Sequence, residues 1–589
     1  MKRSTDGPIL HRAWLSLLFV VACALVSFFF GLGTVPLTSP NEGLYAEAAR
    51  EMVEGSSRIL PRANGVVYLE KPPLLYWLAA ASMRAFGENA FAARLPSALA
   101  ALATTGLLVA AGRRLGPRAS GALAGVIFAT SMGLVLVARQ VLFDSLLTLW
   151  TTLALLSFWF GTAPESGTRR RRTALVLVGY AALALALLTK GLVGVALPVL
   201  TVLAYSAVAR DAGRLRRAWS VPGIVLFLAI AAPWHVAAAL AEKRFAWFYF
   251  VNEHWLRFLG RRQPPDFHED PIFSPILSLI LLLLPWGVFL AGAFRSEWRE
   301  REGRRLRSET VFLFCWALVP ALFFTLSRTR TYYYQLPSVP ALALLLGRFW
   351  ARAWEQPRSS PRPRGFLFPA AGLSVVIAAA WLFAGFGSWG SLRNAAWHAL
   401  AFACGGWLLA GLIAGTLFIA THREKAAFAM IAAGVLFTVV AGIRFAAGTT
   451  LPVFRSDEAS ARLIAALGAP EGTRVAVEGK FENHSSLAFY LPPRFRPVLV
   501  VDAVGQGDLA FGSTLEDTRG IFISTTPTMF ELTDNQPLFY LTLSPSKLRV
   551  PPKLKLVACD DETMLWTNVG ELDHLSIGSS VQHPSTRGN

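Results

Sequence analysis

Acidic and basic side chains are concentrated in residues 39–77, a polar, proline-bearing segment between apolar stretches of the chain. Its first part carries Asn41 and Glu42 after a proline that suits the first turn of a helix, so the Glu42 carboxylate would lie near the positive end of that helix. Its second part places Glu70 and Lys71 directly before two prolines, which fix the backbone. A loop of this content usually carries function. A surface helix with solvated acids and a surface ion pair are the alternative interpretations.

Further residues that could do chemistry stand at the ends of apolar stretches. Asp144 lies at the start of one such stretch, shortly after Arg139, and Lys190 lies between two others. Asp144 is a candidate catalytic acid; the alternative is a helix-start acid that Arg139 neutralises. Residues 252–258 carry His254 and Arg257 in a longer polar loop. Cations at the depth of the membrane interface suit a lipid-borne phosphate, although simple contact with lipid head groups is the competing interpretation for Lys190 and Arg257.

The composition defines the elements that must position these residues. Of 589 residues, 54% are hydrophobic and only 16% are charged, which excludes a single soluble core and predicts a polytopic α-helical membrane protein. Windows of about 20 apolar residues define about thirteen expected spans. The first follows a basic segment and is too long for a cleaved signal peptide, so it is expected to be a retained helix. The windows are residues 13–32, 95–112, 118–137, 142–161, 173–188, 190–208, 219–240, 272–293, 309–327, 332–349, 366–386, 396–420 and 426–448.

Arginine clusters assign a side to each loop. They occupy alternate connections, on the side of the basic N-terminus, which the positive-inside rule makes cytoplasmic. The net charge of +19 therefore predicts topology rather than a nucleic-acid partner. The opposite side holds residues 39–77, the turns at Asp144 and Lys190, residues 241–271, residues 327–331 and everything after residue 449. We expect a bacterial inner-membrane protein with its N-terminus in the cytoplasm and its C-terminus in the periplasm.

The chain after residue 449 changes character, because short β-branched runs alternate with turn residues. Ser456 is placed to begin a helix and Gly468 to end it. The expected organisation is a membrane domain at 1–449, with outer loops at 33–94 and 241–271, and a small α/β domain at 450–589. Residues 577–589 are expected to be disordered.

Four linked motifs resemble the bacterial branch of the protein mannosyltransferase and aminoarabinose transferase family. They are N-E-G-L-Y-A-E-A-A-R-E-M from Asn41, L-P-R-A-N-G-V-V-Y-L-E-K-P-P-L-L-Y-W up to residue 77, L-L-T-K-G-L-V-G at 187–194 and N-E-H-W-L-R-F at 252–258. The resemblance covers roughly residues 10–350 and implies a GT-C fold. It also implies transfer of a sugar from a polyprenyl-phosphate (undecaprenyl) carrier to a lipid A, glycan or protein acceptor, with inversion by a single displacement.

The resemblance also implies roles for particular residues. Lys71 corresponds to the family's carrier-phosphate lysine, Arg257 to an arginine of the same pocket, and Tyr334 to a phosphate-contacting tyrosine. The substrate-binding set that we expect is Asn41, Tyr45, Tyr68, Lys71, Lys190, Arg257, Arg330 and Tyr334, with Arg328 as an alternative to Arg330.

The catalytic carboxylate is left open between Glu42 and Asp144. Family members commonly begin the first motif with Asp-Glu, whereas this chain has Asn41, whose amide cannot act as a base. Either a carboxylate nearby takes over, or the acceptor is already ionised and needs orientation more than deprotonation. Glu70 and His254 resemble a divalent-metal pair of the aminoarabinose branch, but two ligands make a weak site. No cofactor is expected to be required.

Two other classes of function make different predictions. A transporter or lipid flippase would carry charges near the middle of its spans and an internal inverted repeat. A membrane-anchored binding protein would depend on the tail and leave residues 39–77 without a purpose. The sequence does not identify the sugar, the acceptor or the oligomeric state.

Overall fold

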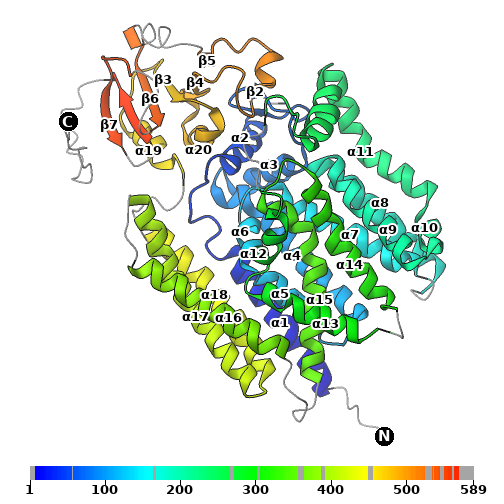
Figure 1. The fold of residues 1–589 in the computed structure, drawn as a ribbon. Helices are drawn as coiled ribbons and strands as arrows, with labels where there is room; N and C mark the ends of the chain where they lie inside the picture. The colour runs from blue at the N-terminus through cyan, green and yellow to red at the C-terminus, as the bar shows by residue number, and fades with distance from the viewer. Residues whose placement is uncertain are drawn as a thin grey trace. The chain divides into compact units, whose positions relative to one another are not determined.

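The computed structural model describes residues 7–569, apart from residues 56, 164–166, 266–270, 302–304, 356–363, 387–391, 449–454, 524–532, 535, 544–549 and 560–562 (Figure 1). The expectation for residues 577–589 lies outside this range. The chain divides into two compact units. The first unit comprises Met1–Val35, Glu70–Ser388 and Trp397–Thr450; the second comprises Pro36–Leu69, Trp389–Ala396 and Leu451–Asn589.

The first unit is helical, because its segments are apolar and long enough to cross a bilayer. Within the described residues, nine helices meet that length and composition, and two further bent pairs raise the number to at most eleven. The nine are α4 (Ala90–Leu115), α7 (Phe143–Thr162), α8 (Arg169–Lys190), α9 (Leu192–Ala209), α11 (Val221–Ala241), α14 (Ser308–Leu326), α16 (Arg364–Phe386), α17 (Leu392–Ala420) and α18 (Glu424–Gly448).

The expected count of thirteen spans is not confirmed, because several windows are not single straight helices. The window 118–137 becomes α5 (Ser120–Ala129) and α6 (Met132–Ala138), bent by 65°. The window 272–293 becomes α12 (Ser274–Leu282) and α13 (Leu290–Arg299), joined through η2 (Trp286–Phe289), with a bend of 108°. The window 332–349 divides into the 3-10 helix η3 (Tyr332–Ser338) and α15 (Val339–Glu355). The first helix, α1 (Gly7–Phe29), has a shorter apolar stretch, Trp14–Phe29.

A buried carboxylate joins three helices of the first unit. Glu297 on α13 accepts hydrogen bonds from Arg348 and Arg352 on α15, at 2.8 Å each, and from the Thr310 hydroxyl on α14 at 2.6 Å. Because each buried charge has a partner of opposite sign, this group fixes the three helices to one another without leaving an isolated ion.

The second unit is built on a six-stranded sheet with the order β5-β4-β3-β6-β8-β7. The strands β3, β4, β5 and β6 run parallel, while β8 pairs antiparallel with both β6 and β7. A buried apolar core that includes Ala476, Leu499 and Tyr540 lies against the sheet. The strands are β3 (Arg474–Glu478), β4 (Leu499–Val501), β5 (Phe522–Ile523), β6 (Leu538–Leu543), β7 (Lys555–Cys559) and β8 (Thr563–Thr567), and the helices include α19 (Glu458–Ala466), η4 (Phe481–His484) and α20 (Ser485–Tyr490).

The second unit also contains more than half of residues 33–94, which were expected to form an outer loop of the membrane domain. Pro36–Leu69 holds α2 (Asn41–Val53) and a hairpin of β1 (Arg62–Ala63) and β2 (Val66–Val67). Asn64 and Gly65 form the two-residue turn of this hairpin, with φ of 55° at Asn64 and 75° at Gly65, as such a turn requires. The Asn64 amide exchanges two hydrogen bonds with the backbone of Val498, so the hairpin is part of the tail domain.

Candidate active site

One group of candidate residues lies where α7 begins and α8 ends. Asp144, in the first turn of α7, accepts a hydrogen bond of 2.6 Å from the ammonium of Lys190, the last residue of α8. The Lys190 Nζ also lies 4.2 Å from the centre of the Tyr334 ring, a cation–π distance. The structure thus brings together Asp144, Lys190 and Tyr334, three residues that the sequence named separately.

Arg139 does not neutralise Asp144, so that alternative interpretation is wrong. Its guanidinium instead donates to the carbonyl oxygens of Ser27, Phe30 and Gly31, at 3.1, 2.8 and 3.1 Å. These are carbonyls at the end of α1, which lack partners within the helix and attract a cation. Lys190 is the counter-charge of Asp144.

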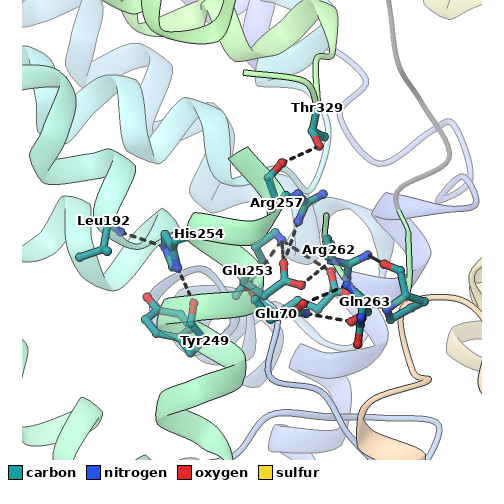
Figure 2. Close-up of polar contacts among 12 residues, drawn as sticks. Glu70, Leu192, Tyr249, Glu253, His254, Arg257, Arg262, Gln263 and Thr329 are labelled. Carbon is teal, nitrogen blue, oxygen red and sulfur yellow. Dashed lines mark hydrogen bonds and ion pairs between the residues drawn. The ribbon is translucent and has the colours of Figure 1, made fainter. Parts of the chain in front are cut away.

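A second group is organised by Glu253, which the sequence analysis did not single out. Figure 2 shows the Glu253 carboxylate between two guanidinium groups. Arg257 Nη1 donates to Oε2 at 2.8 Å, and Arg262 Nε donates to Oε1 at 2.5 Å. Arg262 also donates to Glu70, and Lys71 Nζ lies 3.6 Å from Glu70 and 3.7 Å from Glu253. We call Glu70, Lys71, Glu253, Arg257 and Arg262 the cation cluster.

The cation cluster has three cations and two carboxylates, so it retains one net positive charge. Glu253 is buried, which by itself raises the pKa of its carboxyl, but the charges of Arg262, Arg257 and Lys71 outweigh burial and hold that pKa at about 2. Glu253 is therefore ionised at every physiological pH. The buried carboxylates hold the cations in place, and the surplus positive charge suits an anion such as a phosphate.

His254 links the two groups through its backbone contacts. Its Nδ1 lies 2.5 Å from the Tyr249 carbonyl oxygen, and its Nε2 lies 3.0 Å from the Leu192 backbone nitrogen (Figure 2). A carbonyl only accepts and a backbone N–H only donates, so the proton resides on Nδ1 and the ring is neutral. Burial also lowers the pKa of His254. The imidazole thus holds the turn that follows Lys190.

Gly191 is needed at this turn. Its φ is +78°, and a Cβ there would lie 2.7 Å from His254 Cε1 and 3.0 Å from the Tyr249 hydroxyl. A side chain would therefore be strained and would displace the imidazole.

Glu70 and His254, the expected metal pair, are not arranged to bind a metal ion in this structure. Both ring nitrogens of His254 are already engaged, and Glu70 is bound by Arg262 and Lys71. No group of three or more potential metal ligands occurs among the described residues. In place of a metal, Arg262 supplies the charge that joins Glu70 to Glu253.

The backbone around Glu253 forms a π-helix, η1 (Trp247–Leu256), a rare geometry that is frequent at functional sites. The segment before η3 is bound to this region, because Arg328 N donates to the Phe258 carbonyl and Thr329 Oγ1 donates to the Arg257 carbonyl. Arg330, the expected phosphate ligand, lies half-buried on this segment.

In the second unit, the structure separates the roles of Asn41 and Glu42. Glu42 is buried and its carboxylate accepts hydrogen bonds from the backbone and hydroxyl of Thr38, at 3.0 and 3.1 Å, so it shapes the helix start. Asn41 is not fully buried, and its side chain hydrogen-bonds to none of the described residues. Its amide is therefore available to a ligand. Tyr45 and Tyr68 are buried, and their substrate-binding roles stay predictions.

The sequence analysis missed Glu253 and Arg262. The signal for Glu253 was present, because it lies four residues before Arg257 within the quoted N-E-H-W-L-R-F motif. Nothing in the sequence pattern indicated that Arg262 would bind Glu70, which lies 192 residues earlier.

The chain is similar to known proteins over much of its length. The profile of the family described as Dolichyl-phosphate-mannose-protein mannosyltransferase matches residues 41–249. A relative from Aeromonas salmonicida, named undecaprenyl phosphate-alpha-4-amino-4-deoxy-L-arabinose arabinosyl transferase, is 32% identical over 323 residues. That match covers 55% of this chain and only 57% of the relative. A relative of the same name from Edwardsiella ictaluri is 28% identical over 493 residues, covering 82% of this chain and 85% of the relative.

A solved structure extends the similarity over nearly the whole chain. The crystal structure of ArnT from Cupriavidus metallidurans bound to undecaprenyl phosphate matches with a TM-score of 0.78 and 26% identity. The match covers 96% of this chain and 99% of that one.

Proposed function

We propose that this chain is a GT-C glycosyltransferase of the family that uses polyprenyl-phosphate sugars, and that it transfers a sugar from an undecaprenyl-phosphate carrier to an acceptor. The predicted fold class, a GT-C membrane domain with a small α/β domain, is confirmed. The chain is a multi-pass membrane protein. We propose further that it lies in a bacterial inner membrane with its C-terminus in the periplasm, as the arginine clusters indicate.

The observation that carries the proposal is the cation cluster. Its surplus positive charge, held by buried carboxylates, suits the phosphate of a lipid carrier. The similar ArnT structure is itself bound to undecaprenyl phosphate. Lys71 and Arg257, which are less deeply buried than Arg262, are the members we assign to the phosphate.

In the proposed reaction an acceptor oxygen attacks the anomeric carbon of the carrier-linked sugar. The bond between that carbon and the phosphate oxygen breaks, and the electron pair leaves with the phosphate, so the anomeric configuration inverts. Lys71 and Arg257 stabilise the leaving phosphate, the step at which charge develops. A hydroxyl acceptor also releases a proton, whereas a phosphate acceptor has none to release.

We assign the carboxylate role to Asp144 rather than Glu42. The Glu42 carboxylate already accepts two hydrogen bonds from Thr38, while Asp144 accepts one from the Lys190 ammonium beside Tyr334. Asn41 offers its amide to orient the acceptor. A family aspartate is replaced here by a residue that can only hydrogen-bond, which favours an acceptor that needs orientation.

Substitution of the phosphate ligands tests this proposal. In membrane vesicles with undecaprenyl phosphate-linked 4-amino-4-deoxy-L-arabinose and lipid A, Lys71→Ala should abolish transfer and Arg257→Ala should reduce it. Lys243→Ala is the matched control, because Lys243 is an exposed lysine before η1. Full activity of both Lys71→Ala and Arg257→Ala, with normal amounts of folded protein, would remove the proposed phosphate site.

Mass spectrometry of lipid A, glycan and protein fractions from a deletion strain would identify the acceptor. A mass shift in one fraction names it, and no shift in any fraction argues against glycosyl transfer under those conditions. A flippase is less well supported, because the cation cluster lies on η1, on the segment after it and in the segment before α3 (Leu74–Phe86), outside the long apolar helices.

A further inference from the structure

We propose that Asp457, Ser485 and Ser486 of the tail domain are positioning residues that fix the start of α2 and so aim the Asn41 amide. The inference rests on the proposed function, in which Asn41 orients the acceptor. It concerns contacts within the second unit, to which both α2 and the tail belong.

The donors and acceptors around Ser486 can be assigned completely. Ser486 Oγ lies 3.0 Å from Asp457 Oδ2, and a carboxylate only accepts, so Ser486 is the donor. Ser486 Oγ also accepts from the Asp457 backbone N–H at 2.9 Å. Because its single proton is used, the contact of 3.0 Å with Ser39 Oγ must have Ser39 as the donor. Asp457 therefore sets the direction of the whole chain of hydroxyls.

The same network holds both residues that precede Asn41. Ser39 Oγ accepts from the Ser486 backbone N–H at 3.1 Å, and the Ser39 backbone N–H donates to the Arg455 carbonyl at 3.0 Å. Ser485 Oγ donates to the Pro40 carbonyl at 2.7 Å. Ser39, Ser485, Ser486 and Asp457 are all buried, so water does not replace these bonds readily.

Gly43 allows the close approach on which this network depends. A Cβ at Gly43 would lie 2.8 Å from both the Ser485 carbonyl carbon and the Ser485 hydroxyl. Contacts that short do not occur in well-packed proteins, so α2 meets α20 backbone to backbone. The glycine of the N-E-G-L-Y motif is thus explained by packing against a segment about 440 residues later in the chain.

Around Ser486 the donors have one arrangement, and a buried network of this kind restricts the backbone of the residues attached to it. The Asn41 side chain follows immediately after the two anchored residues and hydrogen-bonds to none of the described residues. The backbone position from which this side chain projects is therefore set by Ser39 and Pro40, and through them by the tail domain. The tail then contributes to transfer without contacting a substrate.

A double-mutant cycle tests the inference. Asn41→Ala and Ser486→Ala should each lower kcat for transfer from undecaprenyl phosphate-linked 4-amino-4-deoxy-L-arabinose to lipid A by about ten-fold or more, since small misplacements of orienting groups are costly. In the double variant, Ser486→Ala should add no further loss, because Ser486 acts through Asn41. Ser39→Ala should behave as Ser486→Ala does. Ser513→Ala is the control, because its hydroxyl donates to Ala510 within another loop of the tail.

Losses that multiply in the double variant would overturn the inference, because a general loss of folded enzyme acts independently of Asn41. If the wild-type protein is active and Ser486→Ala is equally active, the inference is also overturned. If the wild-type protein itself is inactive, the result counts against the proposed function instead. Amide hydrogen exchange tests whether Ser486 holds the start of α2, and it does not require an activity assay. Ser486→Ala, and not Ser513→Ala, should speed exchange of the Gly43 amide, which donates to the Thr38 carbonyl at 2.9 Å. Unchanged exchange would refute the positioning role whatever the substrate.

Discussion

Replacement of Glu253 by Gln measures how strongly the buried carboxylate holds the cation cluster. The surrounding cations move the pKa of Glu253 from an ordinary 4.5 to about 2, although burial opposes the shift. At 1.36 kcal/mol per unit, the ionised form is favoured by about 3 kcal/mol, and Gln, which is nearly the same shape, loses that term. We therefore expect Glu253→Gln to lower the free energy of unfolding by about 3 kcal/mol.

The assay is reversible unfolding in mixed detergent micelles, with Glu242→Gln as the matched control. Glu242 lies 3.5 Å from Arg244 in a partly exposed ion pair, which is worth no more than about 1 kcal/mol. A lowered carboxyl pKa stabilises the fold at any pH above the unfolded value and loses that effect only as the pH falls from 4.5 toward 2. The difference between wild type and Glu253→Gln should thus be constant from about pH 6 to 8. A loss within about 0.5 kcal/mol of the control would refute the central role of Glu253.

Two further predictions concern other charged or constrained positions. Burial, and secondarily the charge of Glu47, raise the pKa of Glu51 to about 7. The folded state therefore binds this proton more tightly than the unfolded chain does. As a result, the free energy of unfolding falls as the pH rises from 4.5 to 7. In Glu51→Gln the amide oxygen can still accept the 2.8 Å hydrogen bond from Gly65 N. This variant should stabilise the protein by up to about 3 kcal/mol at pH 8 and by much less at pH 5. Unfolding curves at the two pH values measure the difference. Gly191→Ala should lower transfer at least ten-fold by displacing His254, an estimate of about 1.4 kcal/mol or more for a residue at φ of +78°. The control is Gly106→Ala, because nothing lies within 4 Å of a Cβ added at Gly106. Equal activity of the two variants would contradict the need for glycine at Gly191.

Local chemistry in the sequence was enough to predict the class of protein and to single out several residues that the structure brings together. Apolar length predicted membrane helices, because the bilayer requires each span to satisfy its own backbone. Lys71, Lys190 and Arg257 were recognisable because cations are rare among such helices and stand in recognisable motifs. The Asn64 turn was predictable because its geometry depends on adjacent residues only.

The bends in two apolar windows were not predictable from hydropathy, which records composition and not direction. Residues 118–137 and 272–293 are as apolar as straight spans, yet each is broken into two helices at angles of 65° and 108°. The tail strands β6 (LFYLTL) and β8 (TMLWT) are not runs of β-branched residues, although β6 lies at the centre of the sheet between β3 and β8. Strand pairing depends on distant partners, so single segments carry a weaker signal.

The sequence by itself determined that charged residues gather at the ends of membrane helices and that Asn41 stands where the family it resembles commonly has an acid. Only the tertiary structure decided which charges pair, because Coulomb energy depends on distance in space and not along the chain. It paired Asp144 with Lys190 rather than Arg139, and Glu70 with Arg262. It also joined Pro36–Leu69 to the tail, since the close approach at Gly43 exists only once α2 and α20 are packed together.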